Sequence, residues 1–178
     1  LYEQGAFQLD EPVSRYIPAL GNLDVFVGGT EDAPRTVPAS RDFTVRELMN
    51  HTSGLTYGFM NATPVDAIYR NEGIDFNACD DGLEALVTRL GDVPLLAQPG
   101  EAWNYSVATD VLGNLVEIWS GVDLQTYLHE QVLGPLGMTD TGFHCPSESV
   151  HRFAANYRRN SKGVLAQPNS STDSRFTR

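Results

Sequence analysis

Tyr105 is the residue whose position in this sequence suggests chemistry. It lies in the stretch "EAWNYSVATDVLGNLVEIW", residues 101–119, where a Pro-Gly loop gives way to an amphipathic helix. A tyrosine at the start of a helix serves more often in packing than in catalysis. Its hydroxyl can also act as a general base or a proton relay. The residue type alone leaves both roles open.

Other catalytic motifs fail on their spacing. His129 begins the stretch HEQVL, but Leu133 stands where the H-E-x-x-H zinc motif needs its second histidine. Ser53, in HTSGL, lacks the flanking glycines of a G-x-S-x-G nucleophile elbow. Cys79 and Cys145 form neither a disulfide framework nor a zinc site and are expected to be free thiols. The sequence therefore predicts no metal and no cofactor.

The overall composition is that of a folded, acidic domain. The chain has 178 residues, 41% of them hydrophobic, and a formal net charge of −11. The negative charge argues against nucleic acid or an anionic membrane surface as a partner. No apolar run approaches the roughly 20 residues that a membrane-spanning helix requires, so we expect no membrane insertion. The cellular compartment is left open.

The residues after Tyr105 have the pattern of a helix with one apolar face. Ser106 is the expected N-cap, and Gly121 is the expected end. Apolar side chains recur at spacings of three and four residues: Val107, Val111, Leu112, Leu115, Ile118 and Trp119.

Three more helices are expected around it. Thr44 and Glu47 have the spacing of a capping box and predict a helix that ends at Gly54. Its buried side would consist of three residues: Val45, Leu48 and Met49. A second helix is expected over residues 81–90, and a third over residues 124–133, capped by Asp123.

Two hairpins complete the expected elements, one from residues 23–29 and 35–40 and another from residues 153–159 and 164–169. Residues 55–80 have many aromatic side chains but no clean period, which predicts a long loop that serves as a lid or pocket wall. Residues 169–178 look like a polar linker. The predicted fold class is mainly α with short β-hairpins, in a single partial domain over residues 1–178.

Four blocks of sequence carry a resemblance to a known family. They read "LMNHTSGL", "PLLAQPGEAWNYS", "TDVLGNLVEIWSG" and "VLGPLGMTDTGF". In this order they resemble the serine β-lactamase and penicillin-binding-protein superfamily, and within it most of all the family VIII carboxylesterases. The resemblance implies a parent fold of the α+β, β-lactamase/DD-peptidase-like type, an α/β sandwich plus a helical domain. This chain would hold most of the helical part.

The resemblance also implies roles for residues. The family's active site combines an S-x-x-K motif, a tyrosine motif and a third motif of the K-T-G, H-x-G or W-x-G type. Only the tyrosine motif maps here, onto "YSV", so Tyr105 would be the general base or proton relay. The block with His51 and Ser53 is a structural landmark, and neither residue is assigned a catalytic role. Val107 stands where lactamases have asparagine, which favours ester over β-lactam substrates.

The two other motifs do not map onto this chain. Lys162 is its only lysine, and Arg159 stands three residues before it, so S-x-x-K occurs nowhere. The resemblance places S-x-x-K upstream of Leu1 and the third motif downstream of Arg178, which makes the chain the middle part of a longer enzyme. A tyrosine acts as a base near neutrality only when cations or strong donors favour its phenolate. We therefore expect the chain alone to be inactive.

The resulting hypothesis is a serine hydrolase, a carboxylesterase that cleaves short-chain esters through an acyl-serine intermediate. Its substrate would be a small ester or amide. Tyr57, Phe59 and Met60 would form an apolar acyl pocket, although the same side chains could equally belong to the core.

Two alternatives stay open. The first is a non-catalytic helical binding module or a degenerate homologue, with uncovered helix faces at residues 107–119 and 124–133 that invite self-association. The second is a β-lactamase or a D-amino-acid peptidase. Motifs outside this segment would separate the first alternative from the enzyme, and the substrates turned over would identify the second.

Overall fold

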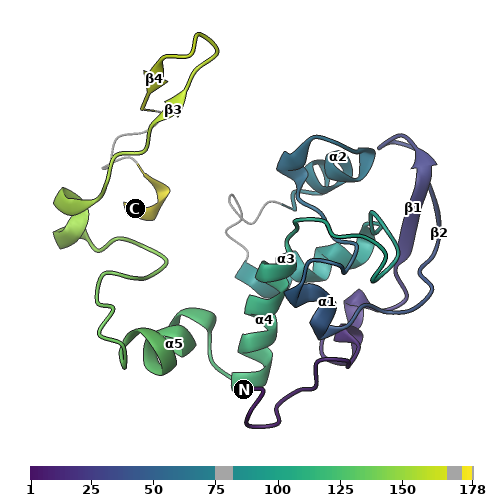
Figure 1. Ribbon diagram of the computed structural model, residues 1–178, viewed down its shortest axis with the longest axis horizontal. Coiled ribbons are helices and arrows are strands. Elements are labelled where there is room, and N and C mark those ends of the chain that lie inside the picture. Colours follow the sequence, from purple (N-terminus) through teal and green to yellow (C-terminus); the bar gives the residue numbers. More distant parts are fainter. Residues whose placement is uncertain (75–81, 168–173, 178) are drawn as a thin grey trace. The chain divides into compact units, whose positions relative to one another are not determined.

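The computed structural model describes residues 1–74, 82–167 and 174–177. The chain divides into two compact units, Leu1–Leu124 and Gln125–Arg178, which are described separately. Helix predominates, as predicted, and the strands form two small antiparallel hairpins (Figure 1). The helices are α1 (Val45–Met49), α2 (Pro64–Asn71), α3 (Gly82–Arg89), α4 (Ala108–Ser120) and α5 (Leu124–Leu128). The strands are β1 (Asp24–Gly29), β2 (Pro34–Pro38), β3 (Arg158–Arg159) and β4 (Leu165–Ala166).

Short turns of 3₁₀ and π helix connect these elements. The 3₁₀ turns are Val13–Arg15, Pro18–Leu20, Gly58–Met60, Leu90–Asp92, Ser147–Arg152 and Arg175–Thr177. A π-helical turn, His129–Leu133, continues α5, so the helix predicted over residues 124–133 changes its winding half-way.

The hairpin β1–β2 confirms the first predicted hairpin. Val25 pairs with Val37, and the register shifts at a bulge between Phe26 and Gly28. The other edge of β1 is also occupied, because the backbone at Leu95 donates to Asp24 and accepts from Phe26. The segment that leads towards Tyr105 is thereby attached to this hairpin.

Helix α1 begins with the predicted capping box. The Thr44 hydroxyl accepts from the Glu47 amide at 3.3 Å, and the Glu47 carboxylate accepts from the Thr44 amide at 2.9 Å. Val45 and Leu48 are buried as predicted, but Met49 is 50% exposed. The prediction for Met49 is wrong because the helix ends at this residue, well before Gly54.

Helix α2 lies where the sequence predicted a loop. Pro64 occupies its first turn, and Thr63 and Asp66 form a second capping box. Its inner face is closely packed, with Val65 and Tyr69 fully buried. The prediction of a continuous loop over residues 55–80 is therefore wrong. The many aromatic residues around this segment obscured its helical period. Its capping box was not recognised in the sequence.

Helix α4 is the centre of the first unit and packs against α1 and α3 (Figure 1). It starts one residue later than predicted, because Val107 is its N-cap and Ser106 instead accepts a hydrogen bond from the Ala108 amide at 3.4 Å. It ends as predicted, at Gly121, which adopts a positive φ. Its buried face belongs to the main core, with these residues fully buried: Val107, Ala108, Val111 and Leu115.

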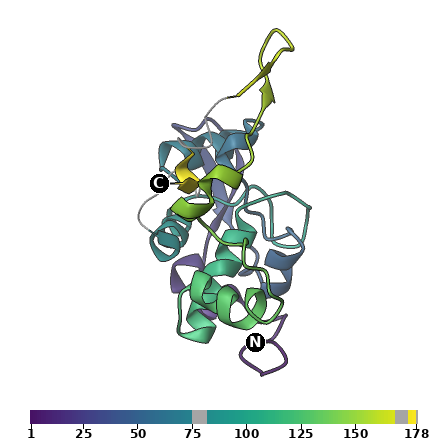
Figure 2. The ribbon, with the colours of Figure 1, turned by 90° about the vertical axis from the view of Figure 1, so that its left-hand side faces the viewer.

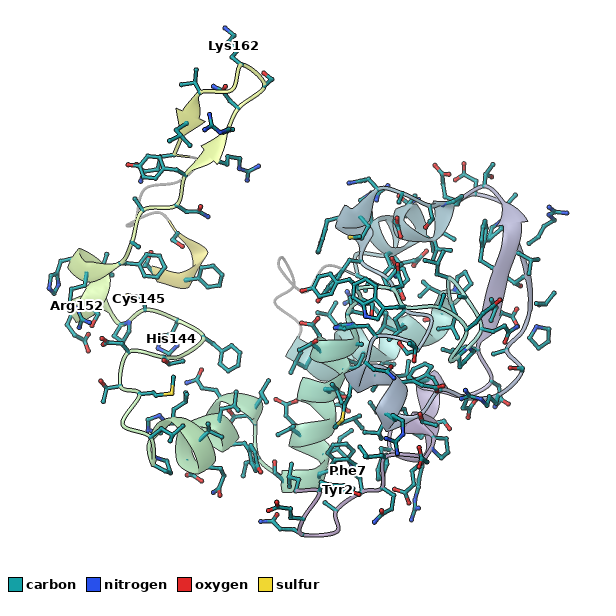
Figure 3. All side chains as sticks on the ribbon, in the orientation of Figure 1. Tyr2, Phe7, His144, Cys145, Arg152 and Lys162 are labelled. Carbon is teal, nitrogen blue, oxygen red and sulfur yellow. The ribbon has the colours of Figure 1, made fainter. Side chains whose placement is uncertain are left out.

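The far end of α4 is covered by the start of the chain. Trp119 stacks on Phe7 at 3.9 Å between ring centroids and meets Tyr16 edge-on. Tyr2 packs beside Phe7, and Figure 3 shows the two residues together. Ile118, predicted on the apolar face, is 45% exposed, whereas Trp119 makes these contacts.

The second unit consists of short elements. The hairpin β3–β4 confirms the second predicted hairpin, with Lys162 at its tip, and it extends from the rest of the unit as a narrow arm (Figures 2 and 3). In the predicted linker, Arg175–Thr177 form a turn, and the Cys145 amide donates to the Phe176 carbonyl at 2.6 Å. Residues 169–173 and 178 lie outside the described residues, so the linker stays a prediction.

Exposed apolar side chains are found on both units. Val132 and Leu136 are examples in the second unit, and no residue of Leu124–Leu133 is buried. Self-association through these faces stays a prediction. Cys145 is a partly exposed free thiol, whereas Cys79 lies outside the described residues. Of the helices that the structure describes, none has both the length and the apolar character for crossing a membrane.

We predict that Glu47→Ala lowers the free energy of unfolding by about 2 kcal/mol, because it removes the carboxylate half of the capping box together with the bond to Arg41. Urea unfolding measures this change. Glu3→Ala, at an exposed position in the same unit, should cost less than about 0.5 kcal/mol. Equal losses for the two variants would contradict the assignment.

The effect of Glu47 should also depend on pH. Burial opposes its ionisation, but bonds from Arg41 and Thr44 lower its pKa below the ordinary 4.5. A carboxylate with a lowered folded-state pKa stabilises the fold fully above the unfolded pKa, and this contribution is lost as the pH falls through the folded value. The difference between the wild type and Glu47→Ala should therefore shrink below about pH 4.5.

Candidate active site

Two loops that lie side by side determine the position of Tyr105. Residues 51–56 and residues 96–107 are joined by hydrogen bonds of 2.7 to 3.3 Å. The donors are the backbone amides of Leu96, Gly100, Asn104 and Val107 and the side-chain amide of Asn104, and the acceptors are carbonyls of residues 51, 52, 54, 55 and 56.

The close approach of these loops requires a glycine at position 54. Gly54 has φ +88°, in the left-handed region, and a Cβ there would lie 2.3 Å from the Ala97 carbonyl oxygen. No side chain fits between the two backbones at this point. The family-like block "LMNHTSGL" thus contributes a backbone contact to the site.

A partly buried ion pair ties the same loop to α1. Arg41 binds both carboxylate oxygens of Glu47, at 2.8 and 2.5 Å, and also donates to the Pro99 carbonyl at 3.1 Å. Burial of the Glu47 carboxylate makes the pair sensitive to the loss of either partner. The cap of α1 and the turn before Tyr105 are therefore stabilised by one guanidinium group.

Tyr105 is the last exposed residue before α4 enters the core. Its side chain is 47% exposed, whereas the next residues, Ser106 and Val107, are fully buried. The rings of His51 and Tyr57 flank it, with centroids at 5.1 and 5.2 Å. The backbone of Tyr105 is thus firmly held while its phenol stays accessible to a substrate.

His51 is itself held in place by its surroundings. Its backbone adopts φ 60°, and its Nδ1 lies 3.3 Å from the Ser106 hydroxyl. The exposed indole of Trp103 meets its ring at 6.1 Å. His51 thereby forms one wall beside Tyr105.

Tyr57 forms a second wall beside Tyr105. Its ring stacks on Phe59 at 4.7 Å, and its hydroxyl donates to the Asp110 carboxylate at 3.0 Å. Burial, followed by the charge of Asp110, raises the pKa of Tyr57 well above its ordinary value of 10. Burial also raises the pKa of Asp110.

Of the four residues predicted for the site, the structure places Tyr57 directly beside Tyr105 and Phe59 next to Tyr57. Met60 follows in the same 3₁₀ turn and is 42% exposed. Their roles as base and acyl pocket stay predictions. None of these three neighbours is fully buried, so they are available at the surface.

Three further residues of this cluster were not predicted from the sequence: His51, Trp103 and Asp110. The spacing of Asp110, five residues after Tyr105, gives no sign that its partner is Tyr57. Trp103 lies within the same motif block as Tyr105 and could have been chosen on that ground alone. His51 was assigned a structural role, and its contacts are consistent with a wall residue.

This arrangement occurs in a chain that matches a known family almost from end to end. Residues 1–175 match the Beta-lactamase family. The chain belongs to this family. The resemblance predicted from the four sequence blocks is confirmed.

Several relatives and solved structures of the family are similar to the chain. Esterase EstB from Burkholderia gladioli is 36% identical over 160 residues, which cover 88% of this chain and 37% of that protein. The structure of simvastatin synthase (LovD) from Aspergillus terreus matches with a TM-score of 0.74 and 32% identity, over 94% of this chain and 41% of that one. EstCE1, described as a hydrolase with promiscuous acyltransferase activity, matches with a TM-score of 0.73 and 29% identity, over 94% and 40%.

These comparisons give the broad class of chemistry and the parent fold. The chain belongs to a β-lactamase-like family with hydrolase and acyltransferase members, and its structural neighbours are consistent with an α+β fold. It spans about two fifths of the length of the curated relatives that it matches. Within the described residues, no group of three or more His, Cys, Asp or Glu side chains could hold a metal ion.

The second unit contains a hollow of about 540 Å³. Its lining combines Phe143, Phe153 and Phe176 with the ion pair between Asp140 and Arg152. His144 and Cys145 also line it, and Figure 3 labels them with Arg152. All lining residues belong to the second unit, and we assign no reaction to them.

We predict that Gly54→Ala destabilises the protein by about 3 kcal/mol or more, since it combines a left-handed alanine with a backbone clash. Gly5→Ala is the matched control, because Gly5 also has a positive φ of +75° but a Cβ there would meet no atom within 4 Å. Its cost should be about 1 kcal/mol. Chemical denaturation of both variants tests the contact, and a Gly54→Ala cost no larger than the control would disprove it.

Proposed function

We propose that this chain is the tyrosine-bearing part of a serine hydrolase, a carboxylesterase in which Tyr105 is the general base. The position of Tyr105 carries the proposal: a half-exposed phenol on a hydrogen-bonded backbone, in contact with the rings of His51 and Tyr57, in a chain of the β-lactamase family. A base must be both accessible to the reacting proton and fixed in orientation. Tyr105 meets both conditions.

The proposed reaction has two stages. A serine hydroxyl attacks the ester carbonyl while Tyr105 takes the serine proton, and the tetrahedral intermediate collapses with expulsion of the alcohol, to which the proton returns. Water then attacks the acyl-serine, again losing a proton to Tyr105, and the acid is released as the serine regains its proton. Each proton taken by Tyr105 is thus passed on before the next step.

The serine and its lysine come from an S-x-x-K motif that this chain does not contain. A phenol needs a cation or strong donors nearby to accept a proton near neutral pH. The described neighbours of Tyr105 are aromatic rings, a histidine and the Tyr57–Asp110 pair. We therefore infer that residues 1–178 alone are inactive, and that the longer protein supplies the missing groups.

Val107 supports an ester rather than a β-lactam as substrate. Its side chain is fully buried in the core, so it presents no polar atom at the position where lactamases have asparagine. An ester needs no such contact with an amide side chain. Hydrolysis of p-nitrophenyl acetate in preference to nitrocefin is the corresponding expectation.

Acyl transfer to an alcohol is a second candidate, favoured by the likeness to simvastatin synthase and to EstCE1. In this case an alcohol, rather than water, attacks the acyl-serine. The exposed rings of Phe59 and Trp103 could hold an apolar acceptor near Tyr105. Product analysis with an added alcohol separates the two candidates, since transfer yields a new ester and hydrolysis yields the free acid.

We predict that Tyr105→Phe in the longer protein lowers turnover of p-nitrophenyl butyrate by roughly 10² to 10⁴-fold, because the base is lost while the ring is kept. Tyr157→Phe, at another exposed tyrosine, is the control and should leave turnover unchanged. Steady-state kinetics with purified proteins provide the measurement. Near-wild-type turnover of Tyr105→Phe, or Tyr105-dependent hydrolysis by residues 1–178 alone, would refute the proposal.

The acyl pocket gives a separate prediction. If Tyr57, Phe59 and Met60 contact the acyl chain, Phe59→Ala should reduce the preference for butyrate over acetate esters by roughly tenfold, through loss of apolar contact. The ratio of kcat/KM for the two esters is the readout. Tyr157→Ala should leave this ratio unchanged, and a similarly unchanged ratio in Phe59→Ala would assign Phe59 to packing only.

A further inference from the structure

Asp110 is a partly buried carboxylate whose hydrogen-bond partner in the first unit is an uncharged side chain. It lies in the first turn of α4, and the Tyr57 hydroxyl donates to its Oδ2 at 3.0 Å. The ion pairs found among the described residues do not include Asp110. Withdrawing a carboxylate from water without a cation is costly, so its presence here calls for a reason.

The hydrogen bond fixes Tyr57 in two respects. A carboxylate only accepts hydrogen bonds, so Tyr57 must point its single proton towards Asp110. The bond also determines the direction of the ring, since the hydroxyl lies at the end of the side chain. The ring, centred 5.2 Å from the Tyr105 ring, then cannot swing away without breaking the bond.

The constraint on Tyr57 is passed on to Tyr105. Tyr105 is 47% exposed, so its phenol has free space on the solvent side and depends on its two ring neighbours for its orientation. The ring of His51 is held separately, by the contact between its Nδ1 and the Ser106 hydroxyl. Without the bond to Asp110, the ring of Tyr57 would keep its packing against the core and its stacking on Phe59, which is itself 56% exposed, but its hydroxyl would lose its carboxylate partner.

We propose that Asp110 is a positioning residue, which holds Tyr57 as a wall against Tyr105 and so keeps the phenol of Tyr105 aimed at the reacting proton. This inference rests on the proposed function of Tyr105. Asp110 does not touch the substrate in this scheme, and it acts through Tyr57 alone.

A pair of substitutions separates hydrogen bonding from simple packing. Asp110→Leu removes the acceptor at similar size, and it should lower kcat by roughly tenfold or more with KM within about threefold, because a misaligned base slows the chemical step. Asp110→Asn keeps an acceptor oxygen and should retain kcat within about threefold of the wild type. Equal kcat for the Leu variant and the wild type would overturn the proposal.

A double-mutant cycle tests whether Asp110 acts through Tyr57. Tyr57→Phe alone should lower kcat about as much as Asp110→Leu, and the double variant should be no slower than either single variant. Multiplicative losses in the double variant would refute the coupling. If Asp110→Leu does not fold, Asp110→Asn and Tyr57→Phe decide the matter: the proposal requires the first to be active and the second to be slow.

Two controls complete the experiment. Tyr16→Phe removes a hydroxyl that binds another carboxylate, that of Glu11, and should leave kcat unchanged. Tyr105→Phe, measured in parallel in the longer protein, separates a failure of the proposed function from a failure of the positioning role of Asp110. Full activity of Tyr105→Phe defeats the proposed function, whereas its inactivity together with wild-type kcat in Asp110→Leu defeats only the positioning role.

Discussion

The contact between residues 51–56 and residues 96–107 is the constraint on which the site depends. These segments are far apart in the sequence, yet their backbones are joined from Leu96 to Val107 by hydrogen bonds. Loops usually leave backbone groups to water, and pairing them inside the protein avoids the cost of burying them unsatisfied. The result is a rigid junction without regular secondary structure. His51 lies in the first segment, Tyr57 directly follows it, and Tyr105 lies in the second, so the pairing brings the three rings together.

Burial changes abruptly along the chain at Tyr105, and this change explains how a residue in a loop can have a well-defined backbone position. Ser106, Val107 and Ala108 are fully buried and anchor the start of α4 in the core. Tyr105 is one peptide bond away from this anchor and is half-exposed. A group so close to a packed helix start inherits a fixed backbone, as sites on regular elements do. Only its side-chain torsions remain to be fixed, and the rings of His51 and Tyr57 limit those.

Features that depend on residues close together in the sequence were predicted correctly. They are the capping box of Thr44 and Glu47, the end of α4 at Gly121 and the two hairpins. Helix α2 was missed although Thr63, Pro64 and Asp66 form a cap of the same kind. Contacts across the fold gave no such signal. Nothing in the sequence links Asp110 to Tyr57, because their separation has meaning only after the two loops pair.

The electrostatics of the cluster bear on the proposal that residues 1–178 alone are inactive. Burial and the nearby Asp110 carboxylate raise the pKa of Tyr57, which means that these surroundings favour the protonated form of Tyr57. A phenolate in the same cluster would need a positive charge beside it. The chain's one lysine, Lys162, lies at the tip of the β3–β4 hairpin in the other unit. In the proposed function, the cluster supplies shape and orientation, and the positive charge comes from the lysine of an S-x-x-K motif, which residues 1–178 do not contain.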